Sequence, residues 1–350
     1  MHQFSRLSKL RFCLPKAIER RASLLDARRL FFLARDSLYN NRPMFELVFL
    51  GTSASAPSAE RNLTSTLLIH EGTRFVLDCA EGTQRQILKS GAGFKDLRRI
   101  FLTHGHLDHI LGIGGLASTL GQWDVPVDSK LEIYGGRWAL DRVRDLMKVV
   151  MRGKEAEIEI EYLEIKPGVL VREKNLTVSA FNVLHRGTGN FGFLFEEKSK
   201  RPFLVERAEA LGIPVGPERK KLVAGESIVL ADGRVIQPEA VLGELVPGTK
   251  FVYVGDLARI TEVIEPARDA EGLVMEATYL AQDRDIARKH GHITAAEAAH
   301  AAREANVKQL YLTHISRRYN GHLVHAEATA IFPNTIVCND LDRFTVKRER

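Results

Sequence analysis

From residue 45 onward, the chain alternates short apolar runs with polar or glycine-rich breaks. Apolar runs bounded in this way predict β-strands, because β-branched and aromatic side chains suit a pleated, buried surface. We predict strands at 45–50, 67–69, 74–78, 99–102, 131–135, 159–163, 176–184, 192–196, 250–254, 272–276 and 309–313.

Three stretches between these runs are predicted to be helical. The first, 83–88, stops at Gly91, and the second covers 138–151. The third, 295–305, is rich in alanine and follows Thr294, which forms a capping box with Glu297 three residues later. Because strands and helices interleave along the whole chain, we predict an α/β protein whose sheets are covered by helices.

The composition is that of a globular protein with a sizeable core, with 45% hydrophobic and 27% charged residues in a chain of 350. No apolar run reaches the roughly 18 residues of a membrane-spanning helix, so no membrane partner is expected. Cys13, Cys79 and Cys338 are odd in number and far apart, which indicates no disulfide framework. These features fit a cytoplasmic protein of one large domain or two small ones.

The net charge of +6 comes from the N-terminal segment. Residues 1–43 hold ten Lys and Arg against three acidic residues, whereas 44–350 hold 40 basic and 41 acidic ones. The segment could be a targeting peptide, a nucleic-acid-binding arm, or sequence upstream of a true start at Met44. We favour a mis-assigned start or a dispensable extension. Any polyanionic partner of the body must then be held by local basic patches.

Residues 197–240 differ in amino-acid composition from the rest of the chain. Seven Lys and Arg residues between positions 198 and 221 surround the glycine- and proline-rich stretch that contains Gly212, Pro214, Gly216 and Pro217. A stretch broken by glycine and proline and rich in basic residues is typical of a protruding arm inserted into a domain. An ordinary surface excursion is the alternative.

The most informative stretch is the loop 103–109, which follows the predicted strand 99–102 and contains three histidines and an aspartate. Alternate positions of an extended loop point to opposite sides. His104 and His106 can therefore share one metal ion, while Asp108 and His109 reach a second. Imidazole nitrogen together with carboxylate oxygen suits zinc, with manganese and iron as alternatives.

Further ligands are expected after other apolar strands, where side chains converge on a sheet edge. His185, Asp256 and His314 each follow such a strand. We assign His104, His106 and His185 to one ion, Asp108, His109 and His314 to the other, and Asp256 as a bridge between them. A paired-metal site of this kind lowers the pKa of a water and can hydrolyse a phosphodiester.

The leaving oxygen of such a reaction needs a proton. His292 is the candidate general acid, since its ordinary pKa lies near neutral pH, and Glu276 could orient it. Alternatively, His292 is only a residue at the start of the helix that follows Thr294. Asp108, His292 and Glu276 are thus the predicted catalytic residues.

Taken together, these residues resemble the metallo-β-lactamase superfamily, and more closely the ribonuclease Z family of tRNA 3′-processing endonucleases. The His104–His109 loop alone marks only the superfamily. Longer stretches that carry the closer resemblance are 49–52, 60–62, 78–86 and 312–319, with the sequences FLGT, ERN, DCAEGTQRQ and LTHISRRY. The resemblance covers essentially all of 44–350.

The resemblance implies an αββα sandwich, two zinc ions per subunit held by the seven ligands above (with manganese possible), and a homodimer. It also implies cleavage of precursor tRNA after the discriminator nucleotide, leaving a 3′-hydroxyl on the tRNA and a 5′-phosphate on the trailer. Arm 197–240 would be the exosite, which grips tRNA from the opposite subunit. The implied substrate-binding residues are Arg61, Asn62, Glu81, Thr83, Gln84, Gly212, Pro214, Gly216 and Pro217.

Three positions depart from the family pattern. Met275 stands where the family has a histidine beside Glu276, Ile293 replaces a serine after His292, and Ala80 replaces a glycine. None of these is a predicted ligand, but the first two put the rate in question. Alternative functions are a phosphodiesterase acting on other phosphodiesters, a thioester or lactone hydrolase, and a tRNA-binding protein without activity.

Overall fold

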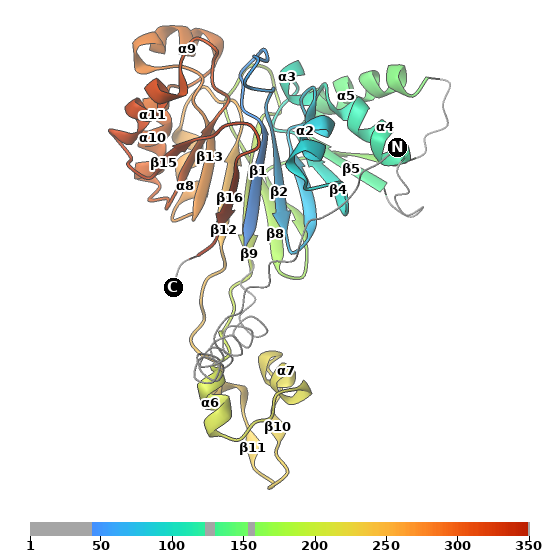
Figure 1. The fold of residues 1–350 in the computed structure, drawn as a ribbon, viewed down its shortest axis with the longest axis vertical. Coiled ribbons are helices and arrows are strands. Elements are labelled where there is room, and N and C mark those ends of the chain that lie inside the picture. Colours follow the sequence, from blue (N-terminus) through green and yellow to red (C-terminus); the bar gives the residue numbers. More distant parts are fainter. Residues whose placement is uncertain (1–43, 123–129, 153–157, 349–350) are drawn as a thin grey trace, which may run out of the picture. The chain divides into compact units, whose positions relative to one another are not determined.

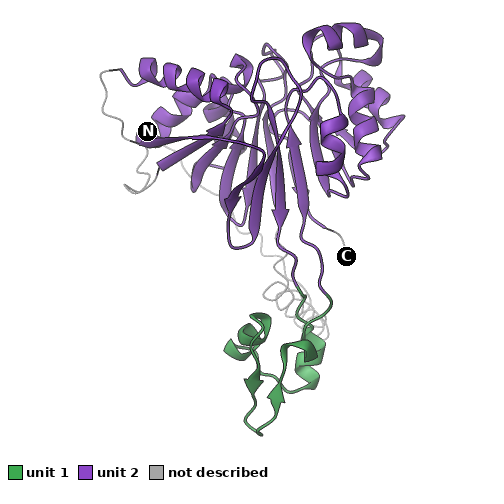
Figure 2. Cartoon of the chain, turned by 180° about the vertical axis from the view of Figure 1, so that it is seen from behind, with its two compact units in different colours: residues 1–42, 201–244 green, residues 43–200, 245–350 purple. Residues whose placement is uncertain are grey.

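The computed structural model describes residues 44–122, 130–152 and 158–348. The chain divides into two compact units, one made of 43–200 with 245–350 and another that contains 201–244 (Figure 2). The predicted N-terminal extension, 1–43, lies outside the described residues. Within the described ranges, no helix is long and apolar enough to cross a membrane.

The larger unit contains two mixed seven-stranded sheets (Figure 1). In spatial order, the first sheet consists of β16 (Arg343–Val346), β1 (Phe45–Gly51), β2 (Ser65–His70), β3 (Thr73–Leu77), β4 (Leu97–Phe101), β5 (Lys130–Gly135) and β6 (Glu159–Glu164). The second consists of β15 (Thr335–Val337), β14 (Leu310–Thr313), β13 (Gly272–Glu276), β12 (Lys250–Val254), β9 (Phe191–Glu197), β8 (Leu176–Asn182) and β7 (Gly168–Arg172). Strands β3 to β6 are mutually parallel, as are β12 to β15, and the other neighbours are antiparallel.

Helices cover the outer face of each sheet (Figure 1). The elements α2 (Thr83–Ser90), α3 (Leu107–Ile110), α4 (Ile113–Gln122) and α5 (Arg137–Val150) accompany the first sheet. The second is accompanied by α8 (Thr261–Ala267), η2 (Ala281–Asp283), α9 (Arg284–His290), α10 (Ala295–Glu304) and α11 (Gly321–Thr329). The predicted capping box is present, because the Thr294 hydroxyl accepts from the Glu297 N–H and the Glu297 carboxylate accepts from the Thr294 N–H.

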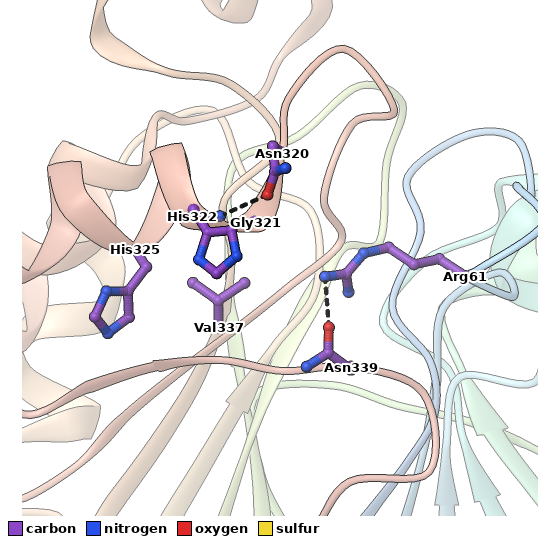
Figure 3. Close-up of a pocket in the computed structure, with 7 residues that line it drawn as sticks. All are labelled: Arg61, Asn320, Gly321, His322, His325, Val337 and Asn339. Atoms are coloured by element: carbon purple, nitrogen blue, oxygen red, sulfur yellow. Dashed lines mark hydrogen bonds between the residues drawn. The ribbon is translucent and has the colours of Figure 1, made fainter.

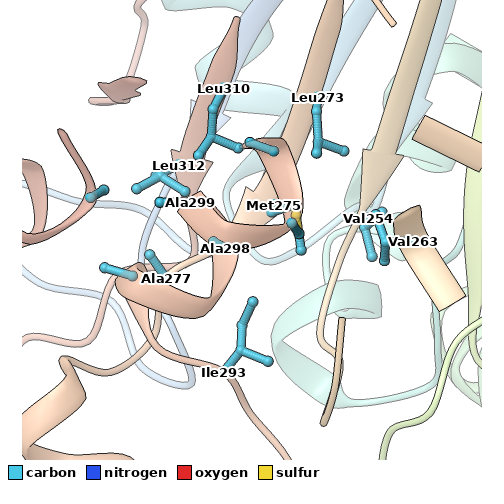
Figure 4. Packing of buried hydrophobic residues seen from close by; sticks show 14 of the residues in the cluster. Val254, Val263, Leu273, Met275, Ala277, Ile293, Ala298, Ala299, Leu310 and Leu312 are labelled. Carbon is cyan, nitrogen blue, oxygen red and sulfur yellow. The ribbon is translucent and has the colours of Figure 1, made fainter. Parts of the chain in front are cut away.

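The alternation of side chains along β1 explains the layers. Phe45, Leu47 and Phe49 enter a cluster between the two sheets, which is dominated by phenylalanine. Val48 and Leu50 point the other way, into a cluster that the first sheet shares with its helices. Full burial of each such side chain stabilises the fold by roughly 1.5–3 kcal/mol. The αββα sandwich implied by the sequence is thus confirmed, with a third cluster between the second sheet and α10 (Figure 4).

The smaller unit, in its described part 201–244, has a core of its own. It comprises α6 (Val205–Ala210), α7 (Pro217–Val223), β10 (Ile228–Val229), β11 (Val235–Ile236) and η1 (Pro238–Ala240). Phe203, Leu222 and Ile236 belong to its apolar cluster. Buried Arg219 donates to the backbone oxygen of Ile213 at 2.8 Å and so braces the glycine- and proline-rich loop.

Candidate metal centre

The seven predicted ligands lie at strand ends and come together in the larger unit. The 104–109 loop follows β4, and the short helix α3 begins within this loop at Leu107. His185 follows β8, Asp256 follows β12, and His314 follows β14. Potential ligand atoms of His104, His106, His185 and Asp256 all lie within 4.8 Å of one another, and those of Asp108, His109 and His314 do the same.

Asp256 lies between these two groups. Its Oδ2 is 3.6 Å from His104 Nε2 and 3.7 Å from His185 Nε2. Its Oδ1 is 3.5 Å from His109 Nε2 and 3.2 Å from His314 Nε2. One carboxylate oxygen thus faces each group, which is the arrangement that a ligand bridging two cations needs.

The chemistry of these atoms fits a pair of cations. Among the described residues, His109 Nε2, His314 Nε2 and Asp256 Oδ1 are buried without a hydrogen-bond partner. Buried polar atoms are normally paired, so unpaired atoms facing one point indicate a ligand there. His106 Nδ1 also faces His104 Nε2 at 2.8 Å, a contact that a cation between two imidazoles would satisfy.

The other nitrogen of four imidazoles is held by the surrounding protein. His104 Nδ1 contacts the Thr103 hydroxyl, and His185 Nδ1 donates to the Gly291 carbonyl at 2.7 Å. The two remaining partners are Asp78 Oδ2, 2.9 Å from His109 Nδ1, and Thr278 Oγ1, 2.8 Å from His314 Nδ1. Each contact leaves Nε2 free to bind a metal, as outer partners of metal-binding histidines usually do.

The pKa shifts and the carboxylate charges of the site also favour the binding of metal ions. Burial lowers the pKa of His106 to about 4, helped by nearby His185, so this imidazole is neutral and able to bind a metal. Burial would also lower the pKa of His109, but Asp256, Asp78 and Asp108 outweigh it and raise the pKa well above its ordinary value. Such a concentration of carboxylates is what bound dications would neutralise.

His292 and Glu276 form a buried pair beside this centre. His292 Nδ1 lies 3.0 Å from Glu276 Oε2, and Glu276 Oε1 accepts the Leu257 N–H at 2.8 Å. Burial opposes protonation of His292, but the negative charges of Glu276 and Asp256 outweigh it and raise its pKa to about 9. His292 also lines the pocket over the centre, so a proton that it carries would face that pocket.

That pocket has a volume of about 410 Å³. Ser55, His106, Leu107, Asp108, Arg142, Arg186, Asp256, Tyr279, His290 and His292 line it. Asp108 is positioned by the Ser55 N–H, which donates to its Oδ2 at 2.9 Å.

Two departures from the family pattern lie outside the pocket. Met275 and Ile293 are fully buried and belong to the apolar cluster between the second sheet and α10, with Ala298 and Ala299 (Figure 4). Neighbouring strand positions point to opposite faces, so Met275 faces the helices while Glu276 faces His292. Met275 therefore contributes its side chain to the apolar cluster and not to the pocket.

The predicted substrate-binding residues near 61 have structural contacts. The Arg61 guanidinium donates to Thr52 Oγ1 and to the Cys338 carbonyl, both at 2.6 Å. It also donates to Asn339 Oδ1 at 2.9 Å (Figure 3). Asn62 Nδ2 donates to the Glu81 carbonyl. These contacts fix the loop, and Arg61 also lines the pocket drawn in Figure 3.

Arg61, Asn62 and Glu81 nevertheless line a common cavity of about 480 Å³, which is distinct from the pocket over the centre. Thr83 is fully buried, and its hydroxyl donates to the Ala80 carbonyl at 2.7 Å, so it shapes the turn before α2. Gln84 accepts a long hydrogen bond from Thr119, 3.4 Å, at the α2–α4 contact.

Asp78 and Thr278 were not predicted as site residues. Asp78 directly follows β3, which lies beside β4 and its ligand loop. Thr278 comes two residues after Glu276. The rule that polar residues after neighbouring parallel strands meet at one edge could have found both.

Comparison with known proteins agrees with this geometry. Residues 45–201 match a family model described as anti-Pycsar protein Apyc1, and 224–315 match one described as beta-lactamase superfamily domain. A ribonuclease Z from Bradyrhizobium diazoefficiens is 46% identical over 303 residues, covering 87% of this chain and 100% of the relative. One from Methanothermobacter thermautotrophicus is 40% identical over 305 residues, covering 87% and 97%.

Two solved structures share the fold. The short form of human tRNase Z superposes with a TM-score of 0.62 at 24% identity, covering 87% of this chain and 100% of that one. The metallo-beta-lactamase fold protein YhfI from Bacillus subtilis gives the same TM-score and coverage at 17% identity.

Proposed function

The chain belongs to the ribonuclease Z family, and from this premise we propose that it is a metal-dependent endoribonuclease that removes the 3′ trailer from precursor tRNA. Cleavage falls after the discriminator nucleotide, giving a 3′-hydroxyl on the tRNA and a 5′-phosphate on the trailer. The observation that carries this proposal is the bridging position of Asp256, with one oxygen toward each group of ligand atoms.

The proposed ligands are His104, His106 and His185 for one zinc ion, Asp108, His109 and His314 for the other, and Asp256 for both. Manganese is the alternative ion. Bound there, the pair of ions would polarise the phosphodiester and lower the pKa of the attacking water. The protein's own contribution is a rigid ligand set, since every Nε2 ligand has its Nδ1 held by a neighbour.

His292 is the proposed general acid. Glu276 holds its Nδ1, which leaves Nε2 to face the pocket and the departing 3′-oxygen. The buried Glu276 carboxylate favours the imidazolium form of His292, which carries the required proton. Glu276 also accepts a hydrogen bond from Thr278, which contacts His314, so the acid and a metal ligand share one support.

The unit containing 201–244 is the proposed exosite, which binds tRNA away from the cleavage point. Gly212, Pro214, Gly216 and Pro217 form its tRNA-facing loop, and Arg219 braces that loop from inside. Phosphate contacts by the basic residues of this unit would supply affinity without sequence information. We further propose a homodimer in which each exosite serves the partner's catalytic centre.

The decisive experiment incubates purified protein with a precursor tRNA bearing a 3′ trailer, with and without a chelator. We expect cleavage after the discriminator, its loss on chelation, and its loss in Asp256→Ala. Bis(p-nitrophenyl) phosphate is assayed in parallel. Its hydrolysis by a protein that leaves every precursor tRNA intact would favour a phosphodiesterase that acts on other substrates.

A further inference from the structure

Two arginines line the catalytic pocket without belonging to the proposed metal set. Arg142 lies on α5, and Arg186 directly follows His185. The carboxylates of the pocket lining belong to Asp108 and Asp256, both proposed metal ligands. The other lining side chains are cationic or neutral, so bound ions would leave the pocket with positive charge and no free protein anion.

Arg142 is held in place by its neighbours. Its Nη1 donates to the Gly105 carbonyl at 2.9 Å, and its guanidinium carbon lies 5.2 Å from the centre of the Trp138 ring. The Trp138 ring meets the His106 ring edge-on at 5.5 Å. A Cβ at Gly105 would come within 2.8 Å of the indole, so the tryptophan packs directly on the ligand loop. Arg142 is thus fixed to the segment that carries the metal ligands.

Arg186 is held by the segment that precedes His292. Its Nη2 donates to the Lys289 carbonyl at 2.5 Å, three residues before His292. Among the described residues, neither Arg142 nor Arg186 has a carboxylate within ion-pair distance, whereas nearby Arg144 is paired with Asp141 at 2.8 Å. A guanidinium held at a backbone carbonyl, with donors left over and no anion, is suited to bind phosphate.

We propose that Arg142 and Arg186 bind the phosphates on either side of the scissile phosphodiester. The site then selects a linkage inside an RNA strand over an isolated phosphodiester. This inference rests on the proposed function, because the general-acid role of His292 decides which end of the RNA strand lies on its side of the pocket. The departing 3′-oxygen belongs to the tRNA and faces His292, so Arg186 binds the phosphate on the tRNA side. Arg142 binds the first phosphate within the trailer.

The trailer offers a direct test of this polarity. A trailer of one nucleotide contains no phosphate beyond the scissile one, whereas a longer trailer does. The experiment compares Arg142→Gln and Arg186→Gln on precursors with one-nucleotide and five-nucleotide trailers, and on bis(p-nitrophenyl) phosphate. Arg144→Gln, on the same helix as Arg142, and Arg259→Gln, paired with Glu262, are the matched charge-loss controls.

With the long trailer, we expect each pocket variant to lower the ratio of kcat/KM on the precursor to that on bis(p-nitrophenyl) phosphate by about ten- to a hundredfold. The slope of log kcat/KM against log salt concentration should become shallower by about 0.7 for each lost phosphate contact. With the one-nucleotide trailer, the Arg142→Gln effect should vanish while the Arg186→Gln effect persists. Both controls should keep the wild-type ratio.

Equal losses on precursor and small substrate would show that the arginines only brace the loops, and would overturn the proposal. Ratios equal to those of the controls would do so as well. If Arg142→Gln does not fold, Arg142→Lys keeps the charge without the planar donors and should lower the ratio partly; an unchanged ratio there contradicts the proposal. Failure of the wild-type protein to cleave any precursor would instead refute the proposed function.

Discussion

Asp78 holds His109 in the orientation that binding of the second ion requires. The carboxylate is fully buried and accepts from His109 Nδ1 at 2.9 Å, from the Thr103 N–H at 2.8 Å and from the Thr103 hydroxyl. Its backbone φ of 55° lies in the left-handed region, which asparagine also tolerates. Asp78→Asn therefore changes the hydrogen-bonding chemistry at nearly constant shape.

An asparagine at this position cannot replace both oxygens. If its oxygen keeps the contacts with Thr103, its amide N–H faces the N–H of His109 Nδ1. His109 can relieve that clash only by moving its proton to Nε2, the atom proposed to bind the metal. Loss of such an outer partner lowers metal affinity about 10- to 100-fold, or about 1.4–2.7 kcal/mol. Loss of a buried, charge-assisted hydrogen bond also destabilises the metal-free protein by about 1.5–3 kcal/mol.

Metal affinity is measured by competition with a chromophoric chelator, and stability by calorimetry of the metal-free protein. Asp340→Asn is the control, because Asp340 accepts from the Asn62 N–H, the Thr52 hydroxyl and Gln86 without contacting a proposed ligand. We expect the control to lose stability and keep its metal affinity. Two ions bound by Asp78→Asn as tightly as by the wild type would refute the proposed role of Asp78.

Four further outcomes are expected. His292→Ala should lower kcat on precursor tRNA about 10²- to 10⁴-fold but affect bis(p-nitrophenyl) phosphate little, because p-nitrophenolate departs without a proton; equal losses would contradict general-acid catalysis. Replacing 203–242 by a short glycine linker should raise KM for precursor tRNA and spare the small substrate, as steady-state kinetics would show. Met275→His should cost about 1–3 kcal/mol of stability in denaturant unfolding while kcat stays within twofold. Burial opposes ionisation of Glu197, but hydrogen bonds, led by the one from His70, lower its pKa below 4.5. The wild type should therefore have a higher Tm than Glu197→Gln, with the full difference above pH 4.5 and a smaller one as pH falls further.

Much of the layered fold could be predicted from local pattern. The capping box at Thr294 marked the start of α10, and apolar runs marked the central strands of both sheets. The edge strands β7, β15 and β16 lie outside the predicted runs, because β7 and β16 are partly exposed with weak apolar signals and β15 spans only three residues. The edge strand β6 coincides with the predicted strand 159–163. Strand β16 is defined by pairing with β1, almost 300 residues earlier, and no local pattern records such a pairing.

The contacts of individual side chains near the site also depend on pairings that a motif does not record. Met275 adjoins Glu276 in sequence, but the two-residue period of a strand places these neighbours on opposite faces. Arg61 stays a predicted RNA contact, and its acceptors Thr52, Cys338 and Asn339 include two from the far end of the chain. Motif position alone could not show that its guanidinium has structural partners.

The convergence of ligands from His104 to His314 follows from parallel pairing. Tyr253 of β12 is in register with Val274 of β13, and Val274 with Tyr311 of β14. Asp256 and His314 each come three residues after these positions, so both emerge at the same edge of the second sheet. Thr103, before the ligand loop of the first sheet, accepts the Phe191 N–H of the second at 2.9 Å, which joins the two edges. Since His104, His106, Asp108 and His109 come from one sheet and His185, Asp256 and His314 from the other, ions held by this set would tie the two sheets together, and the αββα sandwich itself sets the geometry of catalysis.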